Sequence, residues 1–129
     1  MAASLPPKAD LDACRRCELW KRATQGVPGQ GGRRARLMLV GEQPGDEEDR
    51  QGKPFVGPAG RLLRGAIAEA GVPANDVFLA NAVKHFSWEP RGTRRIHKTP
   101  TQQQIAACLD WLDREIAAVR PRVIVALGA

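Results

Sequence analysis

The stretch RLMLVGEQPG, residues 36–45, joins a short apolar run to a loop that opens with glycine. The run at 36–41 has the length and composition of a strand that is buried on both faces of a parallel sheet. Two similar runs follow, VFLANAV at 77–83 and RVIVALG at 122–128. We therefore predict three strands that run in parallel through the core.

Two segments with helical periodicity separate these strands. Apolar side chains of residues 58–71 share one helical face, and the segment stops at Gly71. The second segment, residues 99–119, opens with a Thr-Pro-Thr-Gln start signal in which we take Thr99 as the N-cap. Strands that alternate with helices predict the α/β class, as a three-layer doubly wound parallel sheet with flanking helices.

The length of 129 residues allows one domain, spanning 1–129. No segment after the last predicted strand returns across the sheet, so we expect a domain truncated at its C-terminus. No apolar run is long enough to cross a bilayer, and no signal peptide is visible. We therefore expect a cytoplasmic monomer with no membrane contact.

Charge is unevenly spread along the chain. Twenty Lys and Arg face 14 Asp and Glu, which gives a formal net charge of +6. This balance favours a polyanionic partner such as nucleic acid, although a basic, soluble surface gives the same sum. In RGTRRIHKTP, residues 91–100, four cations surround His97. A nucleic acid partner would be contacted at its phosphates by these cations: Arg91, Arg94, Arg95 and Lys98.

Candidate site residues follow the predicted strands, because doubly wound sheets bind ligands beyond the carboxyl ends of their strands. Glu42 opens the long loop 41–60, and Asn81 ends the second strand with an amide that can read the edge of an amide-like ring. Phe55 stands in a Gly- and Pro-rich stretch, where an aromatic ring suggests stacking on a ligand. Each residue also has a plain structural interpretation: a solvated acid, a strand-end turn and a cap on the core.

Three cysteines need an explanation, because disulfides are rare in the cytosol. Two of them form Cys14-x-x-Cys17, within a predicted short helix over residues 10–22. Together with Cys108 and His85 they make a Cys3His set, which suits zinc and is also possible for an iron–sulfur cluster. The spacing leaves both metals open, and it equally allows Cys108 to be a small buried apolar residue.

Three stretches resemble the family 4 uracil-DNA glycosylases: GEQPGDEEDRQGKPFVGPAGRLL, VFLANAVKHF, and the CxxC with its later cysteine. The segment KHF…RRIHKTP resembles their UdgX-type branch, in which an inserted basic loop ends in a histidine. The resemblance spans roughly residues 10–129. It implies an enzyme that flips uracil out of DNA and excises it, with single strands preferred.

The resemblance also implies roles for single residues. Glu42 and Gln43 match the catalytic motif, Phe55 matches the ring that stacks on uracil, and Asn81 matches the residue that reads the uracil edge. His97 matches the histidine that bonds covalently to the abasic sugar in UdgX-type proteins. The implied ligands of a [4Fe–4S] cluster are Cys14, Cys17, His85 and Cys108.

Two alternatives stay open on the sequence. One is an ordinary family 4 glycosylase that uses water as the nucleophile. The other is a non-catalytic, metal-stabilised module that binds nucleic acid through the basic loop. The acids concentrated at 42–49 would repel a phosphate backbone, and a binding module has no use for Glu42. We therefore favour the enzyme.

Overall fold

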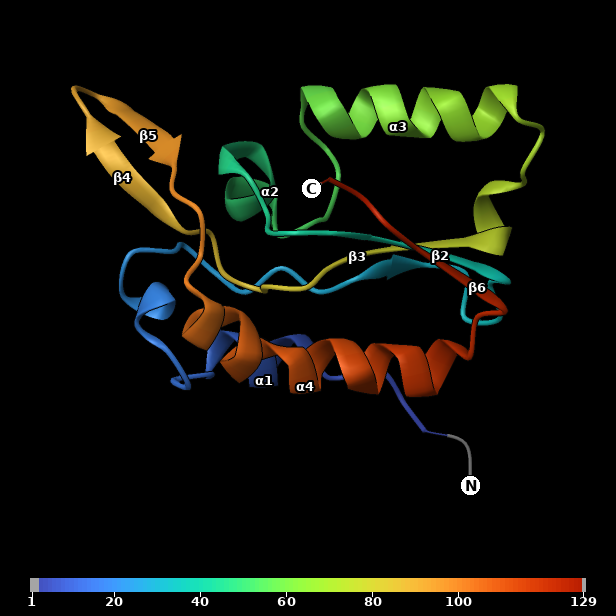
Figure 1. The fold of residues 1–129 in the computed structure, drawn as a ribbon, viewed down its shortest axis with the longest axis horizontal. Coiled ribbons are helices and arrows are strands. Elements are labelled where there is room, and N and C mark those ends of the chain that lie inside the picture. The colour runs from blue at the N-terminus through green and yellow to red at the C-terminus, as the bar shows by residue number, and fades with distance from the viewer. Residues whose placement is uncertain (1–2, 129) are drawn as a thin grey trace.

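A four-stranded sheet with the order β1-β3-β2-β6 forms the centre of the protein, in a computed structural model that describes residues 3–128 (Figure 1). Strand β2 (Leu37–Gly41) pairs in parallel with β3 (Val77–Asn81) on one side and with β6 (Val123–Ala126) on the other. A short edge strand, β1 (Gln30–Gly31), runs antiparallel to β3. The α/β class and the three parallel strands are confirmed, and the extra edge strand makes the sheet mixed. The burial predicted for the last strand is wrong, because β6 forms the other edge of the sheet and is exposed along its length.

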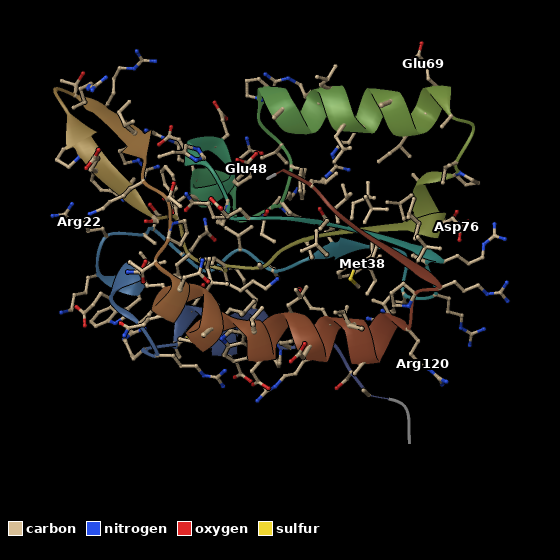
Figure 2. The ribbon with its side chains drawn as sticks, viewed as in Figure 1. Arg22, Met38, Glu48, Glu69, Asp76 and Arg120 are labelled. Atoms are coloured by element: carbon tan, nitrogen blue, oxygen red, sulfur yellow. The ribbon has the colours of Figure 1, made fainter. Side chains whose placement is uncertain are left out.

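Helices cover both faces of this sheet, which gives the predicted three layers (Figure 1). Successive residues of a strand point to opposite faces. Met38 therefore packs on the side of α4 (Gln102–Val119), where Figure 2 labels it, whereas Leu39 packs on the side of α3 (Pro58–Glu69). In the described residues no helix is long and apolar enough to cross a membrane.

The start of α4 differs from the prediction. Thr101 is the N-cap instead of Thr99: its hydroxyl accepts a hydrogen bond from the Gln104 N–H (3.1 Å), and the Gln104 side chain accepts one from the Thr101 N–H (2.9 Å). Thr99 and Gln102 have the same Thr-x-x-Gln spacing, so the sequence pattern fits both starts. On the predicted apolar faces, Leu109 is 41% exposed and Leu62 of α3 is 78% exposed.

Loops that the sequence leaves unstructured contain short elements. Helix α2 (Asp46–Gln51) interrupts the loop after β2, and a 3-10 turn η2 (Ala74–Asp76) precedes β3. The basic segment folds as a β-hairpin of β4 (Trp88–Arg91) and β5 (Arg94–His97). The single helix predicted over residues 10–22 is wrong, since α1 (Lys8–Asp12) and a 3-10 turn η1 (Glu18–Lys21) stand on either side of the CxxC segment.

Candidate active site at the carboxyl edge of the sheet

A cavity of about 320 Å³ lies beyond the carboxyl ends of β2 and β3, where the topology predicts a ligand site. Its walls come from the loop after β2, from α2, from the start of α3 and from the end of β5. Four of the predicted site residues line this cavity: Gln43, Phe55, Asn81 and His97. Glu42 does not line it, and its side chain is exposed.

Asn81 and Phe55 meet above the last residue of β2. A Cβ atom on Gly41 would lie 2.6 Å from Oδ1 of Asn81 and 2.9 Å from Cζ of Phe55. Only glycine leaves space for both side chains at this point. The amide of the strand-end asparagine and the aromatic ring therefore share one end of the cavity.

Phe55 has a left-handed backbone, with φ of +54°. Non-glycine residues rarely adopt this region, and residues held there gather at functional sites. Arg64 of α3 holds the strained segment: its Nε donates to the Phe55 carbonyl (2.9 Å), and its Nη2 donates to the Pro54 carbonyl (3.0 Å). A Cβ on Gly60 would lie 2.2 Å from the Phe55 carbonyl carbon, so α3 can approach only through a glycine.

Gln43 ties together the two ends of the hairpin. Its Oε1 accepts from the Ser87 N–H (2.7 Å), and its Nε2 donates to the Lys98 carbonyl (3.2 Å). The Lys98 N–H in turn donates to the Ser87 carbonyl (3.0 Å). A residue of the GEQPG loop thus fixes the base of the element that carries His97.

Arg95 differs from its predicted role as a phosphate contact. Its Nε and Nη2 both lie 2.6 Å from Oδ1 of Asp46, and its Nη1 lies 2.6 Å from Oδ2 of Asp49. The Arg95 side chain is 16% exposed and that of Asp49 is fully buried. The guanidinium is therefore engaged with two carboxylates of α2 and docks the hairpin onto this helix.

This docking affects the ionisation of Asp46. Burial opposes the charged form, but hydrogen bonds from Arg50 and Arg95 outweigh it and lower the pKa of Asp46 below its ordinary value of 3.8. The acids of α2, which the sequence presents as a repulsive cluster, are thus partners of the basic hairpin.

His97 enters the cavity from the same face of β5 as Arg95, since residues two apart on a strand share a face. Its ring packs edge-on against Phe86, with 5.2 Å between ring centroids and 65° between ring planes. A Cβ on Gly45 would lie 3.0 Å from Nε2 of His97, so the imidazole sits directly over the glycine of the loop. The hairpin thus brings this nitrogen to the cavity that Phe55 and Asn81 line.

The other predicted residues lie outside the cavity. The loop that carries Glu42 contacts the base of the hairpin through Gln43, but within residues 3–128 no hydrogen bond or ion pair joins the side chains of Glu42 and His97. Arg91 and Arg94 face each other across the tip of the hairpin and are exposed. Lys98 is exposed at its base. Within residues 3–128, none of these three cations has an ion-pair partner.

The predicted metal ligands lie outside the cavity, in the segments around α1, after β3 and in α4. Cys14 packs in the same apolar cluster as Cys108 and accepts a hydrogen bond on its Sγ from the Trp111 indole (3.4 Å). Burial raises the pKa of the Cys108 thiol, and the charges of Cys17 and Cys14 raise it further. His85 is 4% exposed, and burial lowers its pKa. All three cysteines are free thiols.

This neighbourhood suits a thiolate-bound metal group in its chemistry, because three sulfur donors come from two separate segments of the chain. In the part of the chain that the structure describes, however, no three His, Cys, Asp or Glu side chains converge as metal ligands do. The structure therefore supports the neighbourhood of the predicted ligands and does not display the coordination itself.

Sequence reasoning missed several residues that hold the site. Glu48 belongs to α2, and its side chain reaches the chain that enters α3 (Figure 2). It accepts hydrogen bonds from the N–H groups of Gly45 (2.9 Å), Val56 (2.9 Å) and Gly57 (2.6 Å). Its position three residues after Gly45 is a helix-start signal that could have revealed it. Glu115 falls on the inner face of α4, where a charged residue requires a partner, and that partner is Lys84.

Comparison with known proteins agrees with this geometry. The sequence model of the Uracil DNA glycosylase superfamily matches residues 28–129. The chain belongs to this superfamily. It is 42% identical over 122 residues to the type-4 uracil-DNA glycosylase of Sulfurisphaera tokodaii, covering 94% of this chain and 52% of that protein. It is 41% identical over 119 residues to the type-4 enzyme of Archaeoglobus fulgidus, covering 92% of this chain and 56% of the relative.

A type-5 uracil-DNA glycosylase of Pyrobaculum aerophilum is more distant, at 33% identity over 94% of this chain and 57% of its own length. The higher identity to type-4 enzymes confirms the predicted family 4 within the superfamily. The chain spans about half the length of the curated relatives it matches.

Proposed function

We propose that the protein excises uracil from DNA, with uracil-containing single strands as its preferred substrate. The observation that carries this proposal is the cavity at the carboxyl edge of the sheet, lined by Phe55, Asn81 and His97 in a chain of the uracil-DNA glycosylase superfamily. A base inside a duplex is out of reach of such a cavity, so the nucleotide has to be flipped out of the stack.

Uracil recognition is assigned to the aromatic ring and the amide at one end of the cavity. The ring of Phe55 stacks on the flipped base. Oδ1 of Asn81 accepts the N3–H of uracil, and Nδ2 donates to O4. Cytosine presents an acceptor at N3 and a donor at C4, which reverses both hydrogen bonds. This pattern selects uracil over cytosine.

Bond cleavage passes through a sugar cation. The C1′–N1 bond breaks, its electron pair leaves with the uracil, and the sugar becomes oxocarbenium-like. We assign the next step to His97, as in the UdgX-type branch: the Nε2 lone pair forms a bond to C1′, and the other ring nitrogen loses its proton to solvent. The departing uracil anion takes up a proton. The product is a covalent protein–DNA adduct.

Two observations support this role of His97. Its Nε2 lies close to Gly45 at the cavity, and the hairpin that carries it is anchored by contacts of Gln43 and Arg95. For Glu42 we propose a role in activating the nucleophile, as the catalytic motif of the family implies. Arg91, Arg94 and Lys98, which are exposed along the hairpin, are proposed to contact the flanking phosphates.

A [4Fe–4S] cluster held by thiolates and one imidazole is proposed for a place outside the cavity. The residues that would hold it are Cys14, Cys17, His85 and Cys108. Because glycosidic cleavage moves no electrons, its role there would be structural. It would link the N-terminal segment to α4. A structural zinc is the alternative.

The decisive experiment mixes the protein with a uracil-containing single-stranded oligonucleotide and resolves the products on a denaturing gel. A band that survives SDS and heat, and that a cytosine-containing oligonucleotide does not give, is the expected result. Free abasic DNA in place of this band would identify an ordinary water-using glycosylase. Retardation on a native gel without any uracil-dependent product would identify a binding module.

A further inference from the structure

A buried ion pair lies behind the cavity and outside every role assigned above. The side chains of Lys84 and Glu115 are 1% and 2% exposed, and Nζ lies 2.5 Å from Oε1. Neither residue lines the cavity. Burying two charges costs desolvation that their attraction often fails to offset, and apolar residues of similar volume commonly fill such a place equally well. A buried pair therefore calls for an explanation beyond packing.

The contacts of the pair lead to the base-reading residue. Nζ of Lys84 donates a second hydrogen bond to the backbone carbonyl of Asn81 (2.7 Å). Oε2 of Glu115 accepts from the N–H of Gly29 (2.6 Å). The ammonium thus lies between the end of β3 and the middle of α4, and α4 is itself tied to the connector before β1. Both carboxylate oxygens of Glu115 therefore accept a hydrogen bond.

Asn81 needs such support because its strand ends there. The pairing of β2 with β3 ends at the Gly41–Asn81 pair, and the chain beyond it is a loop held by two hydrogen bonds, from the Ala82 N–H to the Gly41 carbonyl (2.9 Å) and from the Val83 N–H to the Glu42 carbonyl (2.9 Å). The Asn81 side chain enters the cavity from this last residue. Any rotation of its peptide moves both amide atoms relative to a bound base, so the Lys84 hydrogen bond restrains the orientation on which base reading depends.

We infer that Lys84 is a positioning residue for base recognition: its ammonium, held by Glu115, fixes the Asn81 peptide so that the amide meets the uracil edge. This inference rests on the proposed uracil excision. It makes no use of a charge change at Lys84, and it places the lysine behind the reacting atoms and out of contact with them.

The test uses the double variant Lys84→Met/Glu115→Gln in the intact protein. Met fills the lysine volume, and Gln keeps an oxygen for the Gly29 N–H, so no buried carboxylate is left unpaired. The matched control is Glu115→Gln alone: its amide oxygen can still accept from Nζ of Lys84, so the Lys84 donor stays in place, although the ammonium loses its counter-charge and the thermal midpoint is expected to fall. Thermal midpoints and DNA affinity are measured for both variants beside the excision kinetics.

Control and wild type should excise uracil at similar rates. The double variant should lose about 100-fold in the single-turnover rate of uracil excision, the scale of a 1 Å misplacement, while its Kd for DNA stays near that of the control and its thermal midpoint is no lower. In an Asn81→Ala background the double substitution should cause no further loss, because both changes remove the same interaction. A wild-type single-turnover rate in the double variant, or losses that multiply in the Asn81→Ala background, would overturn the inference.

A second measurement separates this inference from the proposed function. The side-chain amide resonance of Asn81 in DNA-free protein should shift in the double variant relative to Glu115→Gln. If the wild-type protein excises no uracil, the proposed function fails. The amide resonance of Asn81 then becomes the only test of whether Lys84 positions Asn81. A shifted resonance then supports positioning of Asn81 by Lys84, and an unchanged one refutes it.

Discussion

Replacing Arg95 by Gln should separate capture of the sugar from excision of the base. Arg95 donates hydrogen bonds of 2.6 Å to both Asp46 and Asp49, and these are the ionic contacts between hairpin and α2. A hydrogen bond to a charged group contributes about 1.5–3 kcal/mol. Asp49 is fully buried, whereas Asp46 is 37% exposed and is discounted for solvent screening.

The loss of both contacts therefore costs about 3 kcal/mol of hairpin docking, or roughly 100-fold in the docked population. Excision depends on the cavity residues Phe55 and Asn81, and these stay in place. Adduct formation depends on His97, which shares a face of β5 with Arg95. We expect Arg95→Gln to release uracil at a rate near wild type while its ratio of adduct to free abasic product falls by up to two orders of magnitude.

The assay quantifies released uracil and covalent adduct from the same single-stranded substrate. Arg94→Gln is the matched control, because Arg94 is exposed beside the same turn and has no ion-pair partner within residues 3–128. It should keep the product ratio and flatten the slope of log affinity against log salt by roughly 0.7, as the loss of one phosphate contact does. If Arg95→Gln behaves like this control, Arg95 is a phosphate contact and the docking argument is refuted.

Four further outcomes are expected. His97→Ser should abolish the stable adduct and leave uracil release, which a denaturing gel and a uracil assay distinguish; loss of both would assign the residue to excision instead. Asn81→Asp should cut excision strongly, by at least the roughly 100-fold typical of removing a well-placed polar contact, and near-wild-type rates would leave Asn81 a turn residue. Protein purified without oxygen should be brown with iron and sulfide, whereas a colourless protein with one zinc would refute the cluster. Because the pKa of Asp46 is lowered on folding, its contribution to stability is present above pH 3.8 and is lost as the pH falls below that value; Arg95→Gln should show a smaller drop in thermal midpoint over this acid range.

The sequence predicts the sheet and the cavity well, because both depend on local patterns. The apolar runs at 36–41 and 77–83 specify parallel strands, and parallel strands bring their carboxyl ends to one edge. Phe55, Asn81 and His97 line this one cavity, although 41 residues of sequence lie between the phenylalanine and the histidine.

The pairing of charges could not be predicted in the same way. Arg95 reads as one of four equivalent cations, and its engagement with α2 depends on the hairpin register, which sets the face that each side chain occupies. Lys84 lies in a buried bend directly after β3. In the sequence, this segment looks like the charged end of an apolar strand. Its partner, Glu115, lies 31 positions later, a separation at which no local pattern applies.

Folding the basic segment as a hairpin bears directly on the proposed capture of the sugar. Water competes for the sugar cation as soon as it forms, so a histidine on a mobile loop would lose much of the sugar to water. Three anchors hold His97 instead: Gln43 closes the base of the hairpin, Arg95 docks it on α2, and the ring of Phe86 packs against the imidazole. A strand also fixes the nitrogen more tightly than a loop does. On the proposed mechanism, the ion pairs of Arg95 with Asp46 and Asp49 therefore fix the position of the nucleophile His97. Because these acids pair with Arg95, the cations at the tip of the hairpin stay available for DNA.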